Sequence, residues 1–303
     1  MKFKPIVPSD FPKLKKFFQR QRYRLCAYSL PSIIAWNSAE FQSYAAVDGK
    51  SLIVSSEFTS RIENRHLILP VSPSKDYPPL QLHDLAVKLK FDKYWFVPED
   101  YLLQYGKALV ESFFEVKEQK DYKDYIYAAD DLALLKGNKY SRKRNLIHQF
   151  ERSHVDKDRV TIEKMVPSFL SACIDFLEKW CEERSCDIDE NEALFCERQA
   201  AINTIENIDL FELDGILLRI DGEINAFGIA SRLTESIGVL HFEKAFASKK
   251  GLYQYFDREC ARRLFKGCSY INKESDMNVP GLAKTKKSYH PVMTVKSYML
   301  TVR

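Results

Sequence analysis

The sequence has few of the features that mark membrane, secreted or disordered proteins. No apolar run approaches the roughly 20 residues that a membrane span requires, and the opening segment MKFKPIVPSDF has no apolar core of a secretory signal. Only 10 glycines and 12 prolines occur among 303 residues, which argues against disorder and low complexity. We therefore expect a folded, cytoplasmic protein without a transmembrane segment.

Metal ligands and disulfide frameworks are also poorly represented. The seven cysteines are odd in number and scattered through sequence with a helical pattern, so reduced thiols are expected. Cys181 and Cys186 form a close pair, but no second pair and no cluster among the six histidines complete a zinc site. We expect no metal.

Several catalytic motifs are missing. The chain contains no Walker phosphate loop, no His-Glu-x-x-His, no Gly-x-Ser-x-Gly elbow and no dinucleotide-binding fingerprint. These absences argue against P-loop NTPases, zinc proteases, α/β-hydrolases and dehydrogenases.

The pattern of elements predicts two α/β domains, a number that also suits the chain length. Both halves show helix, hairpin, strand, helix and strand in similar order, which indicates a duplication with domains 1–130 and 131–303. The expected helices are 9–24, 80–89, 98–109, 162–183, 190–205 and 252–265, with a basic helical segment from 132. The expected strands are 41–47, 52–56, 66–71, 94–97, 125–128, 215–220, 223–231, 237–246 and 269–272.

A strand–helix–strand unit over 237–272 offers the first candidate site. The carboxyl ends of its parallel strands and the start of its helix surround one crevice, where ligands of open α/β sheets bind. Strand alternation places Glu243 with His241 on one face, and Glu274 with Asn272 on one face. Either glutamate is a candidate general base; the alternative is a strand carboxylate paired with a nearby lysine.

The start of the predicted helix 252–265 is a candidate phosphate site. Lys249, Lys250 and Gly251 would bring two ammonium groups together with the free N–H groups and positive end of the helix. The alternative is an ordinary capped helix.

The segment 284–291 gathers lysine, tyrosine and histidine after the acidic end of the last predicted strand. Lys287 is a candidate to stabilise an oxyanion, and Tyr289 or His290 to return a proton to a leaving group. The alternative is a basic surface turn ended by Pro291.

Positive charge is concentrated in one region although the net charge is only +4. The segment 136–152 contains six basic residues and only one acid, Glu151. This excess of positive charge predicts an anion-binding surface, and a solvated helix face is the alternative. The six are Lys136, Lys139, Arg142, Lys143, Arg144 and Arg152.

Several motifs occur in a fixed order: LKGNKYSRKRN (135–145), LHFEKA (240–245), Gly251, YIN (270–272), Asp276, PGL (280–282) and KSYHP (287–291). Together they resemble the family named for the C-terminal domain of bacterial phosphatidylglycerol lysyltransferase, especially its stand-alone branch. The resemblance implies two tandem GNAT (acyl-CoA N-acyltransferase)-like domains with mixed central sheets, related to Fem-type aminoacyltransferases. It also implies transfer of an aminoacyl group from charged tRNA to an acceptor, which is phosphatidylglycerol for membrane-bound relatives.

Two positions depart from that family. Lys273 and Ala283 stand where relatives often carry arginine, in Asn-Arg-Glu-Glu-Asp and Gly-Leu-Arg motifs. Neither lysine nor alanine reproduces a bidentate guanidinium contact, so the substrate of relatives does not carry over automatically.

We therefore expect an acyltransferase that moves an aminoacyl group from aminoacyl-tRNA to an amine or hydroxyl of a small-molecule, peptide or lipid acceptor, without a tightly bound cofactor. Alternatives are an acyl-CoA-dependent N-acyltransferase and a noncatalytic polyanion-binding module. The expected catalytic residues are Glu243, Glu274, Lys287, Tyr289 and His290. The expected donor-binding residues are Lys249, Lys250, Gly251, Lys143, Arg144, Asn145, Asn272 and Asp276.

Overall fold

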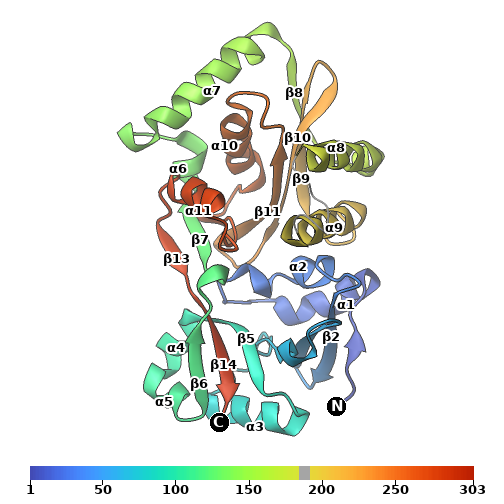
Figure 1. Cartoon of the computed structure of the whole chain (residues 1–303), viewed down its shortest axis with the longest axis vertical. Coiled ribbons are helices and arrows are strands. Elements are labelled where there is room, and N and C mark those ends of the chain that lie inside the picture. Colours follow the sequence, from blue (N-terminus) through green and yellow to red (C-terminus); the bar gives the residue numbers. More distant parts are fainter. Residues whose placement is uncertain (184–191) are drawn as a thin grey trace. The chain divides into compact units, whose positions relative to one another are not determined.

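The computed structural model describes residues 1–183 and 192–303, which form two compact units (Figure 1). The first unit contains residues 1–125, 274–283 and 294–303, and the second contains 126–273 and 284–293. The chain therefore returns to the first unit twice after leaving it. Our division at residue 130 assigned both returning segments to the second domain, because contiguous sequence patterns carry no sign of such a return.

The first unit is built on a seven-stranded mixed sheet in the order β1-β2-β3-β4-β5-β14-β6. Its strands are β1 (Lys4–Pro5), β2 (Phe41–Asp48), β3 (Ser51–Phe58), β4 (His66–Leu67), β5 (Lys93–Pro98), β6 (Phe114–Glu118) and β14 (Ser297–Val302). Its helices are α1 (Phe11–Leu14), α2 (Leu30–Ala35), α3 (Pro79–Leu89), α4 (Glu99–Tyr105) and α5 (Lys107–Glu111). The predicted β2–β3 hairpin is confirmed, with Gly49 at φ 59° in its turn.

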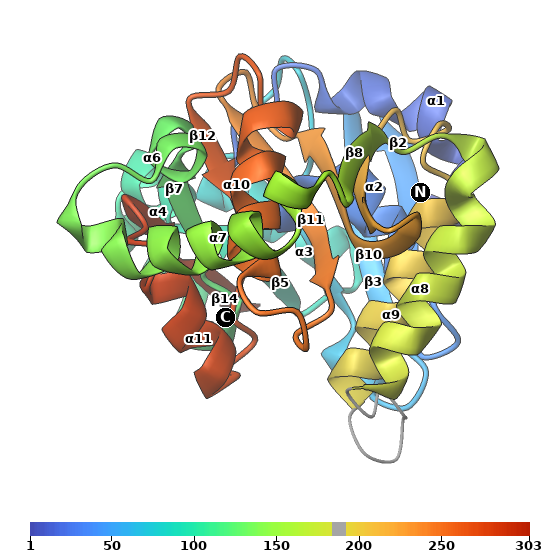
Figure 2. The same cartoon turned by 90° about the horizontal axis from the view of Figure 1, so that it is seen from above.

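The second unit is also built on a seven-stranded mixed sheet, in the order β13-β7-β12-β11-β10-β9-β8. Its strands are β7 (Asp124–Ala128), β8 (Val160–Lys164), β9 (Asp214–Ile220), β10 (Glu223–Arg232), β11 (Ile237–Ala245), β12 (Tyr270–Asn272) and β13 (Met293–Val295). The helices are α6 (Ala129–Leu134), α7 (Ser141–Ser153), α8 (Leu170–Glu182), α9 (Glu192–Glu206) and α10 (Leu252–Leu264), whereas α11 (Pro280–Lys287) passes from the first unit into the second after Ala283. Figure 2 shows α8 and α9 on one face of this sheet and α7 and α10 on the other.

The two sheets have the same plan. In the first sheet, β1 to β5 lie side by side in chain order, β14 follows β5, and β6 forms the far edge. In the second sheet, β8 to β12 lie side by side in chain order, β7 follows β12, and β13 forms the far edge. β14 pairs antiparallel with both β5 and β6, and β7 pairs antiparallel with β12. The predicted duplication is therefore present, with its sixth strands taken from distant segments.

Several predicted elements were wrong in extent. The predicted helix 162–183 begins as strand β8, because the β-branched residues around Ile162 pair with β9, and α8 starts only after Pro167. The predicted helix 9–24 is a series of short turns around α1. Gly106, at φ 80°, divides the predicted helix 98–109 into α4 and α5. Residues 190 and 191 of the predicted helix 190–205 lie outside the described residues, whereas α9 confirms the remainder.

We predict that truncating Leu300 destabilises the first unit, although this residue lies at the end of the chain. Its side chain is fully buried in the sheet, so Leu300→Ala should lower the free energy of unfolding by about 2–5 kcal/mol. Met299→Ala, in the same strand at a half-exposed position, serves as the control and should cost much less. Urea denaturation of both variants tests this; equal losses would contradict the assigned burial.

Candidate active site

The predicted strand–helix–strand unit is present, and its two parallel strands diverge. β11 pairs with β12 only over Ile237–Val239, opposite Tyr270–Asn272, and β11 then continues to Ala245. The crossover helix α10 packs against β9, β10 and β11. Past Val239, therefore, β11 continues without its pairing to β12.

A cluster of buried charges lies at this divergence. The Nζ atom of Lys273, directly after β12, lies 2.9 Å from Oε2 of Glu243 on β11 and 2.6 Å from Oδ1 of Asp257 on α10. The side chains of Lys273, Glu243 and Asp257 are 15%, 13% and 4% exposed. The ammonium group of Lys273 thus joins both strands and the helix of the strand–helix–strand unit. When both carboxylates are ionised, the three side chains together carry one net negative charge.

Burial and the neighbouring charges change the pKa values of Glu243 and Lys273. Burial, followed by repulsion from Asp257, raises the pKa of Glu243 from 4.5 to about 7, although Lys273 opposes the change. Burial alone would lower the pKa of Lys273, but the two carboxylates together raise it above its ordinary value. Near neutral pH, Glu243 can therefore exchange a proton while Lys273 stays charged.

Tyr289 belongs to the same cluster. Its side chain is buried, and its hydroxyl hydrogen-bonds Asp257, so that burial, followed by the charges of Asp257 and Glu243, raises its pKa well above the usual value. The ammonium groups of Lys143 and Lys273 lie 3.9 Å and 5.3 Å from the centre of its ring. Lys143 also donates to Oγ of Ser288 at 2.7 Å, and burial lowers its pKa. Tyr289 is thus a protonated phenol held beside two carboxylates.

Glu274, the other proposed base, belongs to the first unit and not to this cluster's unit. It has a left-handed backbone with φ 58°, and its carbonyl accepts the N–H of Tyr125 at 3.2 Å. Asp276 is in the first unit too: its buried carboxylate accepts the Tyr125 hydroxyl and, at 3.0 Å, the N–H of Asn278. Asp276 therefore braces the turn after β12. Asn272, at the end of β12, is fully buried.

Lys287 and His290 lie on the surface rather than in the cluster. Lys287 is exposed at the end of α11, and its carbonyl accepts the N–H of His290. The exposed His290 ring packs edge-on against Tyr140, and its Nε2 lies 3.3 Å from the carbonyl oxygen of Lys139. Their catalytic roles remain predictions.

Three residues that the cluster depends on were missed by the sequence analysis as site residues. Asp257, Lys273 and Lys286 were not proposed, although Lys286 donates to the carbonyl of Lys273. For Asp257 a signal existed: it directly follows the apolar residues Tyr255 and Phe256 of α10, beside the face that packs on the sheet. An acid next to an apolar stripe is unusual unless it has a partner. Lys273 was noted among the polar residues that follow the last predicted strand and as a departure from the family motif, but it was given no role.

The start of α10 is shaped by close packing as well as by charge. Gly251 has φ +85°, and a Cβ added there would lie 2.2 Å from the carbonyl oxygen of Leu146 on α7. Glycine is therefore required for the contact between α10 and α7. Lys249 and Lys250 are both exposed, and their predicted contact with donor phosphates remains a prediction.

The basic segment before and within α7 is partly committed to contacts inside the protein. Arg144 donates to the carbonyls of Leu135 and Gly137, the latter at 2.7 Å, and Lys139 pairs with Asp131 at 2.9 Å. Asn145 is exposed. Three further basic side chains are exposed and make no hydrogen bond or ion pair within 1–183 and 192–303, namely Lys136, Arg142 and Arg152. A polyanion surface, if present, therefore depends on these three.

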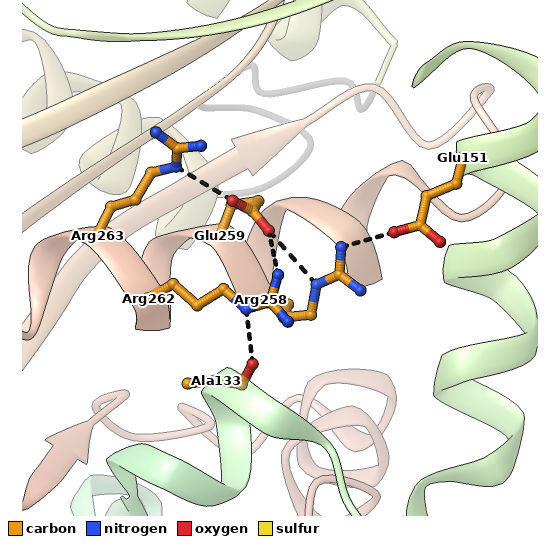
Figure 3. A network of polar contacts seen from close by, with 6 residues as sticks. All are labelled: Ala133, Glu151, Arg258, Glu259, Arg262 and Arg263. Atoms are coloured by element: carbon orange, nitrogen blue, oxygen red, sulfur yellow. Dashed lines mark hydrogen bonds and ion pairs between the residues drawn. The ribbon is translucent and has the colours of Figure 1, made fainter. Parts of the chain in front are cut away.

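A second polar network fixes α10 against its neighbouring helices, as Figure 3 shows. The buried carboxylate of Glu259 pairs with Arg258, Arg262 and Arg263 at 3.4, 3.0 and 3.1 Å. Arg258 also pairs with Glu151 of α7 at 2.8 Å, and Nε of Arg262 donates to the carbonyl of Ala133 in α6 at 2.8 Å. These contacts hold the helix that carries Asp257.

Two features are absent from the part of the chain that the structure describes. Within it, no three His, Cys, Asp or Glu side chains gather as a metal site would require. No helix there combines the length and the apolar character needed to cross a bilayer. Cys186, of the cysteine pair noted in the sequence, lies outside the described residues.

Comparison with known proteins gives consistent relatives. The family model described as phosphatidylglycerol lysyltransferase, C-terminal, matches residues 94–301. A conserved protein of unknown function from Bacteroides thetaiotaomicron is 29% identical, with 100% of both chains covered and a TM-score of 0.87. The C-terminal domain of a protein named as a lysylphosphatidylglycerol synthetase, from Agrobacterium fabrum, is 12% identical, with 97% of this chain and 92% of that chain covered and a TM-score of 0.65. No curated protein matches the chain.

The two mixed sheets, each flanked by helices, define a protein of two α/β units with the same plan, as the resemblance implied for its central sheets. The chain belongs to the phosphatidylglycerol lysyltransferase C-terminal family, whose model covers most of its length. Membership of this family supports an acyltransferase.

We predict that Glu243→Gln changes the pH dependence of stability. Because folding raises the pKa of Glu243 from 4.5 to about 7, the native state binds the extra proton in this window. The contribution of Glu243 is therefore fully present below about pH 4.5 and is lost as pH rises through 7. Urea unfolding at pH 5 and 7.5 should show a smaller difference for Glu243→Gln than for wild type. The exposed Glu235→Gln is the control and should behave as wild type.

We also predict that Gly251→Ala costs more stability than Gly222→Ala. Both glycines have φ +85°, so both substitutions strain the backbone, but a Cβ at Gly222 meets nothing within 4 Å. Each should lose about 1 kcal/mol or more from the backbone conformation, and Gly251→Ala should lose a further amount because α10 must move away from α7. Equal unfolding midpoints for the two variants would show that this contact is not restrictive.

Proposed function

We propose that the protein transfers an aminoacyl group from aminoacyl-tRNA to an amine or hydroxyl acceptor. The observation that carries the proposal is Glu243, placed where β11 and β12 diverge, with its pKa raised to about 7. A carboxylate with such a pKa can accept a proton at neutral pH, as a general base must. Membership of a family named for a lysyltransferase supports an aminoacyl group as the transferred unit.

In this mechanism the acceptor loses its proton to Glu243 as its nitrogen or oxygen attacks the ester carbonyl of the donor. The bond between the carbonyl carbon and the tRNA ribose oxygen breaks as the new bond forms. Tyr289, whose high pKa keeps it protonated, gives its proton to the departing ribose oxygen, and the proton on Glu243 then restores the phenol, directly or through solvent. Protons and electron pairs balance without a cofactor.

Lys273 has two roles in the proposal. Its ammonium group holds Glu243 and Asp257 in place through contacts of 2.9 and 2.6 Å, and it is a fixed positive charge for the developing oxyanion. Lys287 stays the predicted second cation for that oxyanion. Lys249, Lys250 and Gly251 stay the predicted contacts for donor phosphates.

An acyl-CoA donor is the second candidate, and one observation is equally compatible with it. Exposed Lys249 and Lys250 directly precede α10 at the same end of the unit as the strand divergence. A pyrophosphate suits this place as well as a tRNA phosphate does. Donor choice therefore has to be measured.

The test is single-turnover discharge of a charged tRNA pool, with labelled acetyl-CoA in a parallel reaction. Wild type should discharge tRNA at a rate that rises with an apparent pKa of about 7, because the base must be deprotonated. Glu243→Gln should reduce the rate by about 10²–10⁴-fold and lose this pH dependence, whereas Glu235→Gln should not.

Different outcomes lead to different conclusions. A normal rate in Glu243→Gln would exclude Glu243 as the base. Acetyl transfer without tRNA discharge would replace the aminoacyl donor with acyl-CoA. Binding of tRNA that weakens steeply with salt, with neither transfer, would favour the noncatalytic polyanion-binding module.

A further inference from the structure

The ammonium group of Lys143 reaches the buried charge cluster but has no part in the transfer described above. Lys143 lies half-buried in the first turn of α7. Its Nζ atom is 3.9 Å from the centre of the Tyr289 ring and donates to Oγ of Ser288 at 2.7 Å. Burial lowers its pKa, and the carboxylates of Asp257 and Glu243 oppose this change. α7 therefore supplies a second cation to the cluster.

The start of α7 is fixed against the segment that carries Tyr289. The fully buried Tyr140, directly before α7, donates through its hydroxyl to the carbonyl of Tyr289 at 3.0 Å. Lys143 follows three residues later, about one helical turn away. Its partner Ser288 donates its own hydroxyl proton to the carbonyl of Thr285 at 2.6 Å, so the Ser288 oxygen accepts from Lys143. These contacts hold the ammonium group over the ring.

The acidic groups around Tyr289 oppose the loss of its proton. Burial has the largest effect on its pKa, followed by the charges of Asp257 on α10 and Glu243 on β11, and the phenol of Tyr127 on β7 acts in the same direction. In the proposed transfer, however, the O–H bond of Tyr289 breaks, its proton goes to the ribose oxygen, and the electron pair stays on the phenol oxygen. A phenolate beside two carboxylates requires a compensating positive charge.

Two ammonium groups are placed to supply that charge. The Nζ atoms of Lys143 and Lys273 lie 3.9 Å and 5.3 Å from the centre of the Tyr289 ring. A cation over an aromatic face is attracted by the ring, and the attraction strengthens when the ring gains negative charge. Lys273 is already paired with both carboxylates, whereas the hydrogen bond of Lys143 goes to a neutral hydroxyl. The charge of Lys143 is therefore the less compensated of the two.

We propose that Lys143 is a positioning residue that acts through Tyr289: its ammonium group stabilises the phenolate that forms when Tyr289 protonates the leaving ribose oxygen. This inference rests on the proposed function. It places Lys143 beside the leaving group of the donor, in keeping with the donor-side role that the sequence predicts for it. The proton on Glu243 then restores the phenol, and Lys143 itself neither gains nor loses a proton.

The first test measures the acidity of the phenol at position 289 in the full chain, without substrate. Tetrafluorotyrosine replaces Tyr289, because its phenol is far more acidic than that of tyrosine and its fluorine resonances report ionisation. Lys143→Met should make this phenol about tenfold less acidic, because the cation is lost. Lys143→Gln, which can still donate to Ser288, should have the same effect. Lys143→Arg keeps the charge and should titrate as wild type.

Lys266→Met is the matched control. It removes one positive charge from an exposed position after the end of α10, and it should leave the titration unchanged. Thermal melting shows that each variant is folded. Equal titration of wild type, Lys143→Met and Lys143→Gln overturns the inference, and so does a phenol that stays protonated up to about pH 10 when Lys143 is present.

The second test measures single-turnover discharge of charged tRNA. Lys143→Met should slow discharge about tenfold, and Tyr289→Phe should slow it at least as much. Because Lys143 acts through the phenol, Lys143→Met should cause no further loss in the Tyr289→Phe protein. A further tenfold loss in the double variant would show that Lys143 acts on something else.

The two tests separate the inference from the proposed function. If the titration shifts as expected but wild type does not discharge tRNA, the effect of Lys143 on Tyr289 holds and the proposed aminoacyl transfer fails. If wild type discharges tRNA but the titration does not depend on Lys143, the proposed function stands and the role of Lys143 is wrong.

Discussion

The ammonium group of Lys273, buried between Glu243 and Asp257, is the contact on which the second unit depends most. It joins β11, α10 and the end of β12 at the place where strand pairing stops. Removing a charge from water is costly, and the two carboxylates repel each other without the cation between them. The same arrangement that stabilises the strand divergence therefore also sets the proton affinity of Glu243, so that structure and chemistry share one interaction.

Neighbouring residues of β11 carry opposite charges toward opposite faces of the sheet. Glu243 joins the cluster beside α10, whereas the buried Lys244 pairs with Glu197 of α9 at 2.6 Å and lies 4.1 Å from the ring centre of Trp180 on α8. Trp180 in turn donates to the hydroxyl of Tyr253 in α10 at 3.1 Å. The end of one strand thus holds helices on both faces, which gives the candidate base a rigid setting.

The sequence predicted two residues of the charged cluster but not the residues that pair with them. Glu243 and Tyr289 were proposed, because alternation along a strand and a motif after it are local patterns. Asp257 and Lys273 were missed as partners, since their meeting depends on how a helix and two strands pack in space. The same limit explains β14, whose place between β5 and β6 leaves no local signal. The hydrophilic β6 was missed because its exposed residues outweighed its buried Phe114.

The place of β14 in the first sheet has a consequence for synthesis of the protein. The first sheet lacks an interior strand until residues 297–302 are made, so residues 1–125 leave the ribosome long before their sheet can be continuous. β5 and β6 meanwhile present unpaired edges, which makes the nascent chain a natural client for chaperones.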